Sequence, residues 1–226
     1  RIVNNLTLEA GRIDGNHDLT ITGAFDWSGG VVAGTSSSAD ELILPPGSVA
    51  SWTGATKTLR TRRLVSGGSI NWTAGDLALA ADARVQIDNQ LNINVASAVS
   101  VSSDGAPLVD FVLQPPSSLT KIGAGTLSFA SNAAFRNDST VAIQVGRLVV
   151  AGAATDSGTY NVNNGATLEF AIGGVNRVLN SLSQIAGAGS LVKSGGGELA
   201  LNGLYSHSGP VQVDGGILNY STSASS

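Results

Sequence analysis

The sequence has no cysteine among its 226 residues. A disulfide framework, a thiolate metal site and a cysteine nucleophile are therefore excluded. Methionine is absent as well, even from position 1. We therefore expect the chain to be part of a longer protein whose signal peptide, anchor or secretion domain lies outside this sequence. No apolar run approaches the roughly 18 residues of a membrane-spanning helix, so we expect this segment to be soluble and not to insert into a membrane.

Charge is also scarce. Charged residues make up 12% of the chain and the formal net charge is −4, which gives no reason to expect nucleic acid or an anionic membrane surface as a partner. Hydrophobic residues reach 42%, and there are 29 glycines, a balance unlike that of a charge-solvated disordered tail. Many glycines and β-branched residues, with few lysines and glutamates, favour an all-β fold of short strands joined by turns.

Apolar and polar residues alternate in short stretches from one end of the chain to the other. Clear examples are LNINV at 91–95, VDFVL at 109–113, VAIQV at 141–145 and LEFAI at 168–172. Each suits a short strand with one buried face, and the residues between them suit turns. One stretch is ambiguous, because 173–187 has near-helical apolar spacing but fits two strands around Asn180–Ser181 equally well.

Internal repeats predict the architecture. LTKIGAGTLSF at 119–129 matches LVKSGGGELAL at 191–201 without a gap, 72 residues further on. VAIQVGRLVV at 141–150 corresponds to VQVDGGILNY at 211–220, at a separation of 70 residues. Nearer the N-terminus, Trp27, Trp52 and Trp72 are each followed by Ser or Thr and then by Gly within three residues. The recurrence of Trp27 and Trp72 at matching repeat positions favours stacked core or corner positions for the indoles over a surface that binds sugars.

Repeats that cannot bury their apolar faces alone stack into a solenoid. With turns of about 20–25 residues, we predict a parallel β-helix of roughly nine or ten coils. It would be about 45 Å long at about 4.8 Å per stacked strand. A β-sandwich or a closed barrel is the alternative all-β fold, but neither predicts gapless self-similarity at 72 residues.

The C-terminal repeat follows a regular pattern of glycine, leucine, lysine and valine. Its positions are Gly189, Leu191, Lys193, Gly195, Gly197, Leu199, Leu201, Gly203, Tyr205, Gly209, Val211, Val213, Gly216 and Leu218. The copy at 119–150 keeps Lys121, Gly123, Gly125 and Leu127, with Phe135 in the aromatic place. The pattern resembles the autotransporter-associated β-strand repeat of large bacterial surface proteins, although Pro210 and Glu198 stand where threonine is usual in that family.

This resemblance implies an exported, right-handed parallel β-helix at the bacterial cell surface, acting as a stalk or display scaffold in adhesion. It implies the surface of a host or neighbouring cell as the partner, with glycans among the candidate ligands. We interpret 1–220 as a single β-solenoid domain, with Trp-Gly coils over 1–118 and autotransporter-type coils over 119–220. The remaining 221–226, rich in serine, is expected to be a flexible tail.

Residues that could carry catalysis are few. Polysaccharide-cleaving β-helices need two or three converging carboxylates, but the only adjacent acids, Asp40 and Glu41, flank a strand start. The two histidines, His17 and His207, lie in sequences typical of turns. We predict no catalytic residue, no metal and no cofactor. A carbohydrate-binding or polysaccharide-degrading β-helix module is the alternative function.

A cluster of arginines gives the only candidate for ligand contact. Arg60, Arg62 and Arg63 lie in TLRTRRLV at 58–65. Alternation along a strand places Arg60 and Arg62 on one face and Arg63 on the other unless a turn intervenes. They could bind a small anion or an acidic glycan. The alternative is a solubilising outer face that discourages edge pairing.

Overall fold

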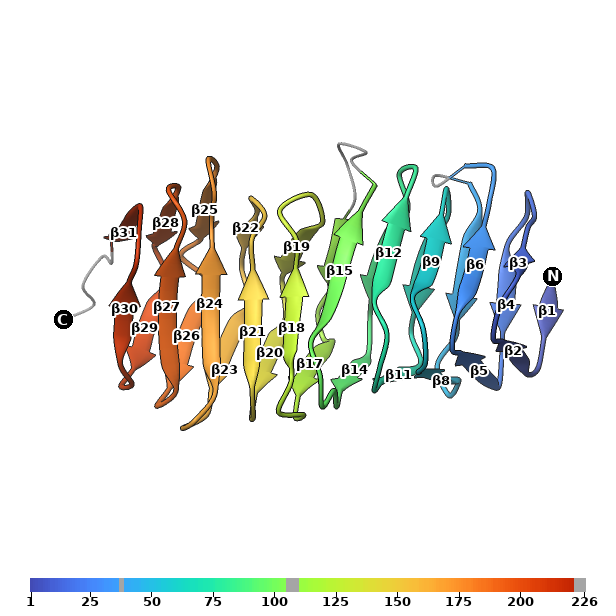
Figure 1. The fold of residues 1–226 in the computed structure, drawn as a ribbon, viewed down its shortest axis with the longest axis horizontal. Helices are drawn as coiled ribbons and strands as arrows, with labels where there is room; N and C mark the ends of the chain where they lie inside the picture. The colour runs from blue at the N-terminus through green and yellow to red at the C-terminus, as the bar shows by residue number, and fades with distance from the viewer. Residues whose placement is uncertain (37–38, 105–109, 222–226) are drawn as a thin grey trace.

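The computed structural model describes residues 1–36, 39–104 and 110–221. This part of the chain is an all-β parallel solenoid of about ten turns, drawn from the N-terminus to the C-terminus in Figure 1. The predicted fold class, a parallel β-helix, is confirmed. Of the predicted tail at 221–226, all but Ser221 lies outside the described residues.

The strands form four parallel sheets: A, B and C are the three faces of the rod, and D continues the face of sheet A in the later turns. Sheet A contains β1 (Ile2–Val3), β4 (Leu19–Ile21), β7 (Glu41–Leu44), β10 (Arg63–Ser66), β13 (Arg84–Ile87), β16 (Asp110–Leu113) and β19 (Ala134–Asn137). Sheet B contains β2 (Leu6–Leu8), β5 (Ala24–Trp27), β8 (Val49–Trp52), β11 (Ser69–Trp72), β14 (Gln90–Ile93), β17 (Ser118–Lys121), β20 (Thr140–Ile143), β23 (Thr159–Val162), β26 (Gln184–Gly187) and β29 (Leu204–His207).

The other two sheets complete the turns. Sheet C contains β3 (Arg12–Ile13), β6 (Gly30–Ala33), β9 (Lys57–Arg60), β12 (Leu77–Ala80), β15 (Val99–Ser103), β18 (Thr126–Phe129), β21 (Arg147–Val150), β24 (Thr167–Ala171), β27 (Ser190–Ser194) and β30 (Val211–Val213). Sheet D contains β22 (Thr155–Asp156), β25 (Asn176–Leu179), β28 (Glu198–Leu201) and β31 (Ile217–Tyr220). Sheet D takes the place of sheet A in the later turns, so one face of the rod has a seam between β19 and β22.

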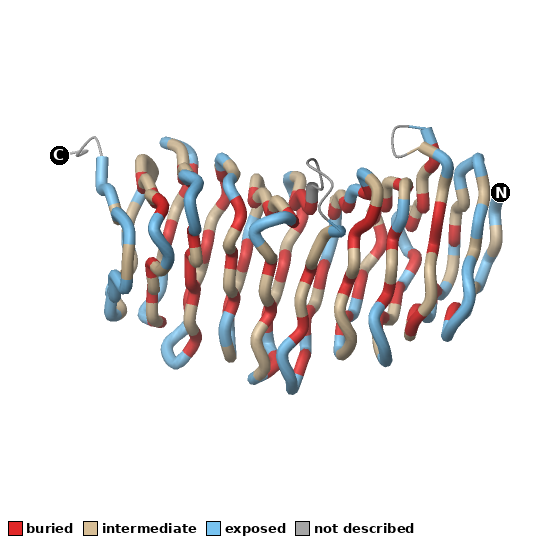
Figure 2. Tube along the Cα trace, turned by 45° about the horizontal axis from the view of Figure 1, so that its top comes forward, coloured by how far each residue is buried: buried red, intermediate tan, exposed pale blue. Residues whose placement is uncertain are grey.

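Within each sheet, a strand pairs in parallel with the third strand before it and the third after it, so successive turns stack on one another. Side chains alternate along the strands: in β5, Phe25 and Trp27 are buried while Ala24 and Asp26 are exposed. The same alternation appears as a repeating change from buried to less buried residues along the tube in Figure 2. The inward residues form one apolar core cluster from Leu8 to Leu201.

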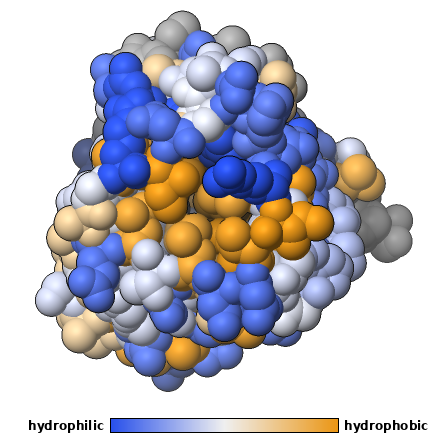
Figure 3. Space-filling model, turned by 90° about the vertical axis from the view of Figure 1, so that its right-hand side faces the viewer, coloured by the Kyte–Doolittle hydropathy of each residue, from blue (hydrophilic) through white to orange (hydrophobic). Residues whose placement is uncertain are grey.

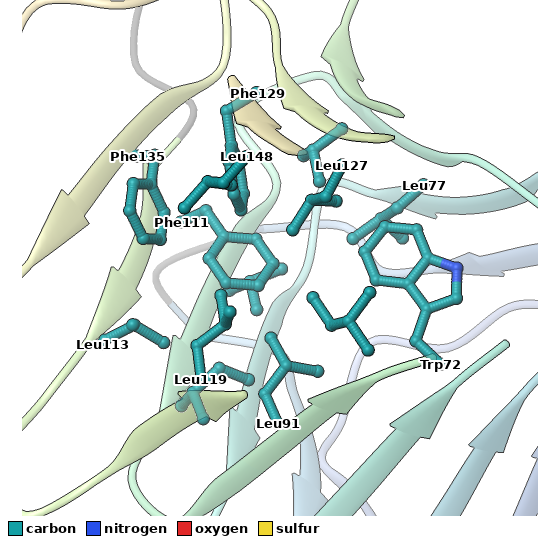
Figure 4. Close-up of a cluster of buried hydrophobic side chains, with 14 of the residues drawn as sticks. Trp72, Leu77, Leu91, Phe111, Leu113, Leu119, Leu127, Phe129, Phe135 and Leu148 are labelled. Atoms are coloured by element: carbon teal, nitrogen blue, oxygen red, sulfur yellow. The ribbon is translucent and has the colours of Figure 1, made fainter. Parts of the chain in front are cut away.

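The three tryptophans stack inside sheet B, which confirms their predicted core role. Trp27, Trp52 and Trp72 occupy the same register position in successive turns, and all three are fully buried. Their ring centroids lie 5.8 Å and 5.5 Å apart in edge-on contacts. Further along the core, Phe111 and Phe129 make a similar contact at 5.1 Å (Figure 4). The favoured edge-to-face geometry adds to the hydrophobic stabilisation of each pair.

The ambiguous stretch 173–187 contains two strands and no helix. Residues Asn176–Leu179 form β25 and Gln184–Gly187 form β26, with Asn180–Ser181 in the corner between them. The second of the two alternatives is therefore correct. Among the described residues, no helix is long and apolar enough to span a membrane.

The two copies of the C-terminal repeat lie on different faces of the rod. Leu119 and Lys121 belong to β17 of sheet B, whereas Leu191 and Lys193 belong to β27 of sheet C. The strands that carry the copies are ten apart in chain order, which is three turns of three strands and one strand more. The repeat therefore advances by one face from one copy to the next.

Candidate functional site

All three lysines of the chain lie inside the solenoid. Lys57, Lys121 and Lys193 are fully buried, although alternation alone would make a lysine an outward residue. Their Nζ atoms donate to backbone carbonyls: Lys57 to Thr53 (2.9 Å), Ala55 (3.0 Å) and Ala74 (2.8 Å); Lys121 to Gly123 and Val145 (3.3 Å); Lys193 to Ser194 (2.7 Å), Gly195 (2.9 Å) and Gly215 (3.1 Å). Each lysine thus joins the corner of its own turn to the corner of the next.

Burial changes the acid–base behaviour of these amines. Desolvation lowers the pKa of Lys57 to about 8 against the opposing attraction of Asp76. Desolvation also lowers the pKa of Lys121 and of Lys193. A buried ammonium is costly unless hydrogen-bonded, and here the acceptors are corner carbonyls. The sequence repeat marked Lys121 and Lys193, but Lys57 lies outside it and no sequence signal identified it.

The structure separates the three arginines predicted to contact a ligand. Thr61 has a left-handed backbone (φ 47°), so a turn intervenes and the alternation that would pair Arg60 with Arg62 is broken. Arg60 is exposed at the end of β9, and Arg63 opens β10. Arg62 is buried, with 2% of its surface exposed.

Arg62 acts inside the protein on the backbone of earlier turns. Its guanidinium donates to the carbonyls of Ala33 (3.2 Å), Glu41 (2.9 Å), Gly15 (3.0 Å) and His17 (3.2 Å). Arg63 lies outside, donating to the Glu41 carboxylate at 3.1 Å and to the Gln86 side chain. A ligand contact of Arg60 and Arg63 stays a prediction. The guanidinium N–H groups of Arg62 already donate to backbone carbonyls of the same chain.

A buried ion pair occupies the seam between sheets A and D. Arg177 and Asp156 are both fully buried, with Nη2 and Oδ2 2.7 Å apart. Asp156 also accepts from the backbone N–H of Asn137 at 2.9 Å and from the Tyr160 hydroxyl at 3.0 Å. Arg177 donates to the Phe135 carbonyl at 2.8 Å. The two side chains therefore satisfy backbone groups of β19, the strand that does not pair with β22.

The pKa values at the seam are shifted by burial and by mutual attraction. Burial raises the pKa of Asp156, although Arg177 and the bond from Asn137 oppose this. Burial is the largest influence on Arg177 and opposes its charge, but the charges and hydrogen bonds of Asp156 and Tyr160 together outweigh it and raise the pKa of the guanidinium. Burial, followed by the Asp156 charge, raises the pKa of Tyr160 well above its ordinary value. No short sequence pattern linked these three residues.

Glycines let successive corners approach one another closely. Gly195 has a left-handed backbone (φ 75°), which glycine adopts without strain. At Gly197 a Cβ would overlap the carbonyl oxygen of Val175 in the preceding turn. These glycines belong to a corner of the coil, as the repeat predicted.

Asp40, Glu41 and His207 each bond to neighbouring groups of the fold. Asp40 accepts from the backbone N–H groups of Thr35 (2.6 Å) and Ser36 (2.9 Å), and the bond from Thr35 lowers its pKa. Its neighbour Glu41 pairs instead with Arg63. His207 was expected in a turn, but it ends strand β29, where its ring bonds the Tyr205 hydroxyl at 3.0 Å and the Gly189 carbonyl at 2.9 Å. The described residues contain no group of three or more His, Cys, Asp or Glu placed to hold a metal ion.

A cavity of about 300 Å³ lies at the N-terminal end of the rod. Its lining includes Ile13, Asp14, His17, Leu19 and Arg62, so the bend containing His17 does meet Arg62. Asp14, however, is paired with Arg12 at 2.6 Å. Figure 3 shows this end as a hydrophobic centre ringed by hydrophilic side chains, the cross-section of the solenoid core.

These features define a parallel β-solenoid repeat protein whose buried cations tie its turns together. Two segments, 119–142 and 191–219, match the family described as Passenger-associated-transport-repeat. The chain thus carries the repeat of autotransporter passenger regions, a structural repeat, as the sequence pattern indicated. No curated protein and no solved structure matches the chain.

Proposed function

We propose that this chain is a non-catalytic stalk segment of an exported bacterial surface protein, which displays other parts of that protein in adhesion or cell-surface contact. Its place would be outside the cell. The supporting observation is that all five buried cations bind corner carbonyls or the seam, as Lys193 bridges to Gly215 and Arg177 to Phe135. Residues that often act on ligands are thus used here to hold successive turns together.

The surface gives little support to a sugar-binding platform. Aromatic side chains supply the stacking surface that sugars use. All three tryptophans and all five phenylalanines are buried, and Tyr160 is buried as well. Tyr205 and Tyr220 lie together in the last turn with ring centroids 5.3 Å apart. Among the described residues, no Trp or Phe is therefore exposed, and Tyr220 in the last turn is an exposed aromatic side chain.

A binding and turnover screen tests this proposal. The full chain would be applied to arrays of glycans and extracellular-matrix proteins, and incubated with neutral and acidic polysaccharides while reducing ends are measured. A stalk gives neither saturable binding nor product. Saturable binding that is lost on Arg60→Ala or Arg63→Ala would replace the stalk by a ligand-binding module. Product release would replace it by an enzyme.

A further inference from the structure

One edge of the outer face of sheet A carries Arg63 and Arg84, in register with Glu41, and the opposite edge carries Asp88. Arg63 and Arg84 are register neighbours at the starts of β10 and β13. Asp88 follows the end of β13. Between these edges runs an outward column in which Ile43, Val65 and Gln86 are aligned across three turns. In the turn of β13 this face therefore has a cation at one edge and a carboxylate at the other, next to the apolar pair Ile43 and Val65 of the two preceding turns.

A groove of about 530 Å³ lies over the acidic edge of this face. Ile43, Val65, Pro45 and Pro46 give it apolar walls, and Asp88 adds a carboxylate. That carboxylate accepts from Gln86 Nε2 at 2.8 and 3.0 Å, which leaves lone pairs for a further donor. A long side chain with an aliphatic stem and a guanidinium head has this chemistry, because its stem packs on apolar surface while its head bonds a carboxylate.

The same chain presents such a side chain on the opposite edge of the same turn. Arg84 is exposed, and it makes no hydrogen bond or ion pair with any side chain that the structure describes. Arg84 and Asp88 lie at the two ends of β13, and four extended residues of about 3.3 Å each keep them too far apart to pair within one chain.

We propose that sheet A binds the sheet A face of a second copy of this chain, with the two rods parallel and related by a two-fold axis that runs along them. Because Arg84 and Asp88 belong to one turn, this axis brings Arg84 of each copy opposite Asp88 of the other at the same height. The contact is isologous, so the charge pair forms twice. The column of Ile43 and Val65 lies near the axis and meets its own counterpart.

The other two faces lack this complementarity. On sheet C, the carboxylate of Glu169 is already bound by Arg147 and by Ser194 of the same chain. The outward side chains of the sheet B strands, from Thr7 to Ser206, include one charged residue, Asp26. Sheet C also has the exposed Arg60 at the end of β9 and Asp214 after β30, but these two residues lie in different turns. Among the described residues, Arg84 and Asp88 of sheet A are a cation and a carboxylate of one turn that a second copy could exchange.

The expected affinity is low. Five strands at about 4.8 Å by a strand of about 13 Å give a footprint of roughly 300 Å² per copy, against about 800 Å² in a stable interface. We expect a dissociation constant of about 0.1–1 mM in solution. Tethering many rods in one orientation raises their effective concentration and so favours the contact.

Sedimentation equilibrium on the full chain from about 10 μM to about 2 mM, a range that brackets the expected dissociation constant, tests the proposal. Arg84→Asp and Asp88→Arg should each abolish association, because each places like charges opposite one another twice. Mixing these two variants in equal amounts should restore it, because every contact is then between opposite charges. The double variant Arg84→Asp/Asp88→Arg should also associate. Arg60→Asp, which reverses an exposed arginine of sheet C, is the matched control and should leave association unchanged.

Three results would overturn the proposal. These are a wild-type chain that stays monomeric over the whole range, single variants that associate like wild type, and loss in the single variants without recovery in the mixture. Circular dichroism of each variant confirms that the fold is intact. A matrix or glycan ligand found in the earlier screen would not change these outcomes, so the two proposals fail independently.

Discussion

Lys193 and Gly215 lie in successive turns of the rod, and the Nζ of Lys193 donates a hydrogen bond of 3.1 Å to the carbonyl oxygen of Gly215. Lys121 makes the equivalent bond to Val145 at 3.3 Å, and Lys57 bonds Ala74 at 2.8 Å. The lysine of the repeat is therefore a connection between turns. Its removal should affect the stability of the stack more than any surface chemistry.

Lys121→Met is expected to destabilise the fold. Methionine keeps most of the side-chain volume but leaves the carbonyls of Gly123 and Val145 without their buried donor, at a cost of about 1–3 kcal/mol. Removing the buried positive charge is itself stabilising. It does not, however, give the two carbonyls a new donor. Urea denaturation followed by circular dichroism measures the difference. Arg60→Met, at an exposed position, should change the free energy of unfolding by less than about 0.5 kcal/mol, and an equal loss in both variants would contradict the role given to Lys121.

The buried amine of Lys57 predicts a stability that rises with pH. Its folded pKa of about 8 lies below the ordinary value of 10.5. Between these values the unfolded state binds more protons than the folded state, so the free energy of unfolding increases as the pH rises through this window. Below about pH 8 the cost of the buried charge is fully present.

Guanidinium midpoints at about pH 7.5 and about pH 9.5 measure this effect. The rise should be smaller in Lys57→Met, because that variant has no amine to deprotonate. Comparing the two chains cancels the contributions of other titrating groups such as Tyr205, whose pKa is raised by burial. Identical pH dependence in both chains would rule out Lys57 as the source.

Gly197→Ala should destabilise the last turns. Its added Cβ would overlap the carbonyl oxygen of Val175, and relieving that overlap costs about 1–3 kcal/mol. Gly173→Ala is the matched control, because a Cβ there meets nothing within 4 Å. The control should be neutral or stabilising by less than about 1 kcal/mol. Thermal unfolding of the two variants provides the comparison, and equal stability would show that the turns can separate without cost.

Asp156 and Arg177 should behave as one unit. Asp156→Asn or Arg177→Met alone leaves a buried charge without its partner and is expected to cost about 3–5 kcal/mol. The double variant should lose clearly less than the sum of the two single losses. A double-mutant cycle from urea denaturation measures this coupling. Strict additivity would mean that the pair does not interact across the seam.

Sequence patterns predicted the repetitive part of the fold well. Alternation and recurrence identified the stacked strands, and Trp27, Trp52 and Trp72 reached the core as expected because identical positions of successive turns superimpose. Arg62 was placed wrongly beside Arg60, since strict alternation does not anticipate a left-handed Thr61. The link between Asp156 and Arg177 joins residues 21 positions apart, and only the stacking of complete turns brings them together.

The offset of the two repeat copies has a geometric consequence. The copies begin in β17 of sheet B and β27 of sheet C. Side chains at equivalent positions of the motif therefore follow a helical path around the axis of the rod. Two successive copies lie on different faces; a third copy with the same offset would begin on the third face, and a fourth would return to the first. A long passenger built this way would present its recurring features to every side, whatever its rotation about its own axis.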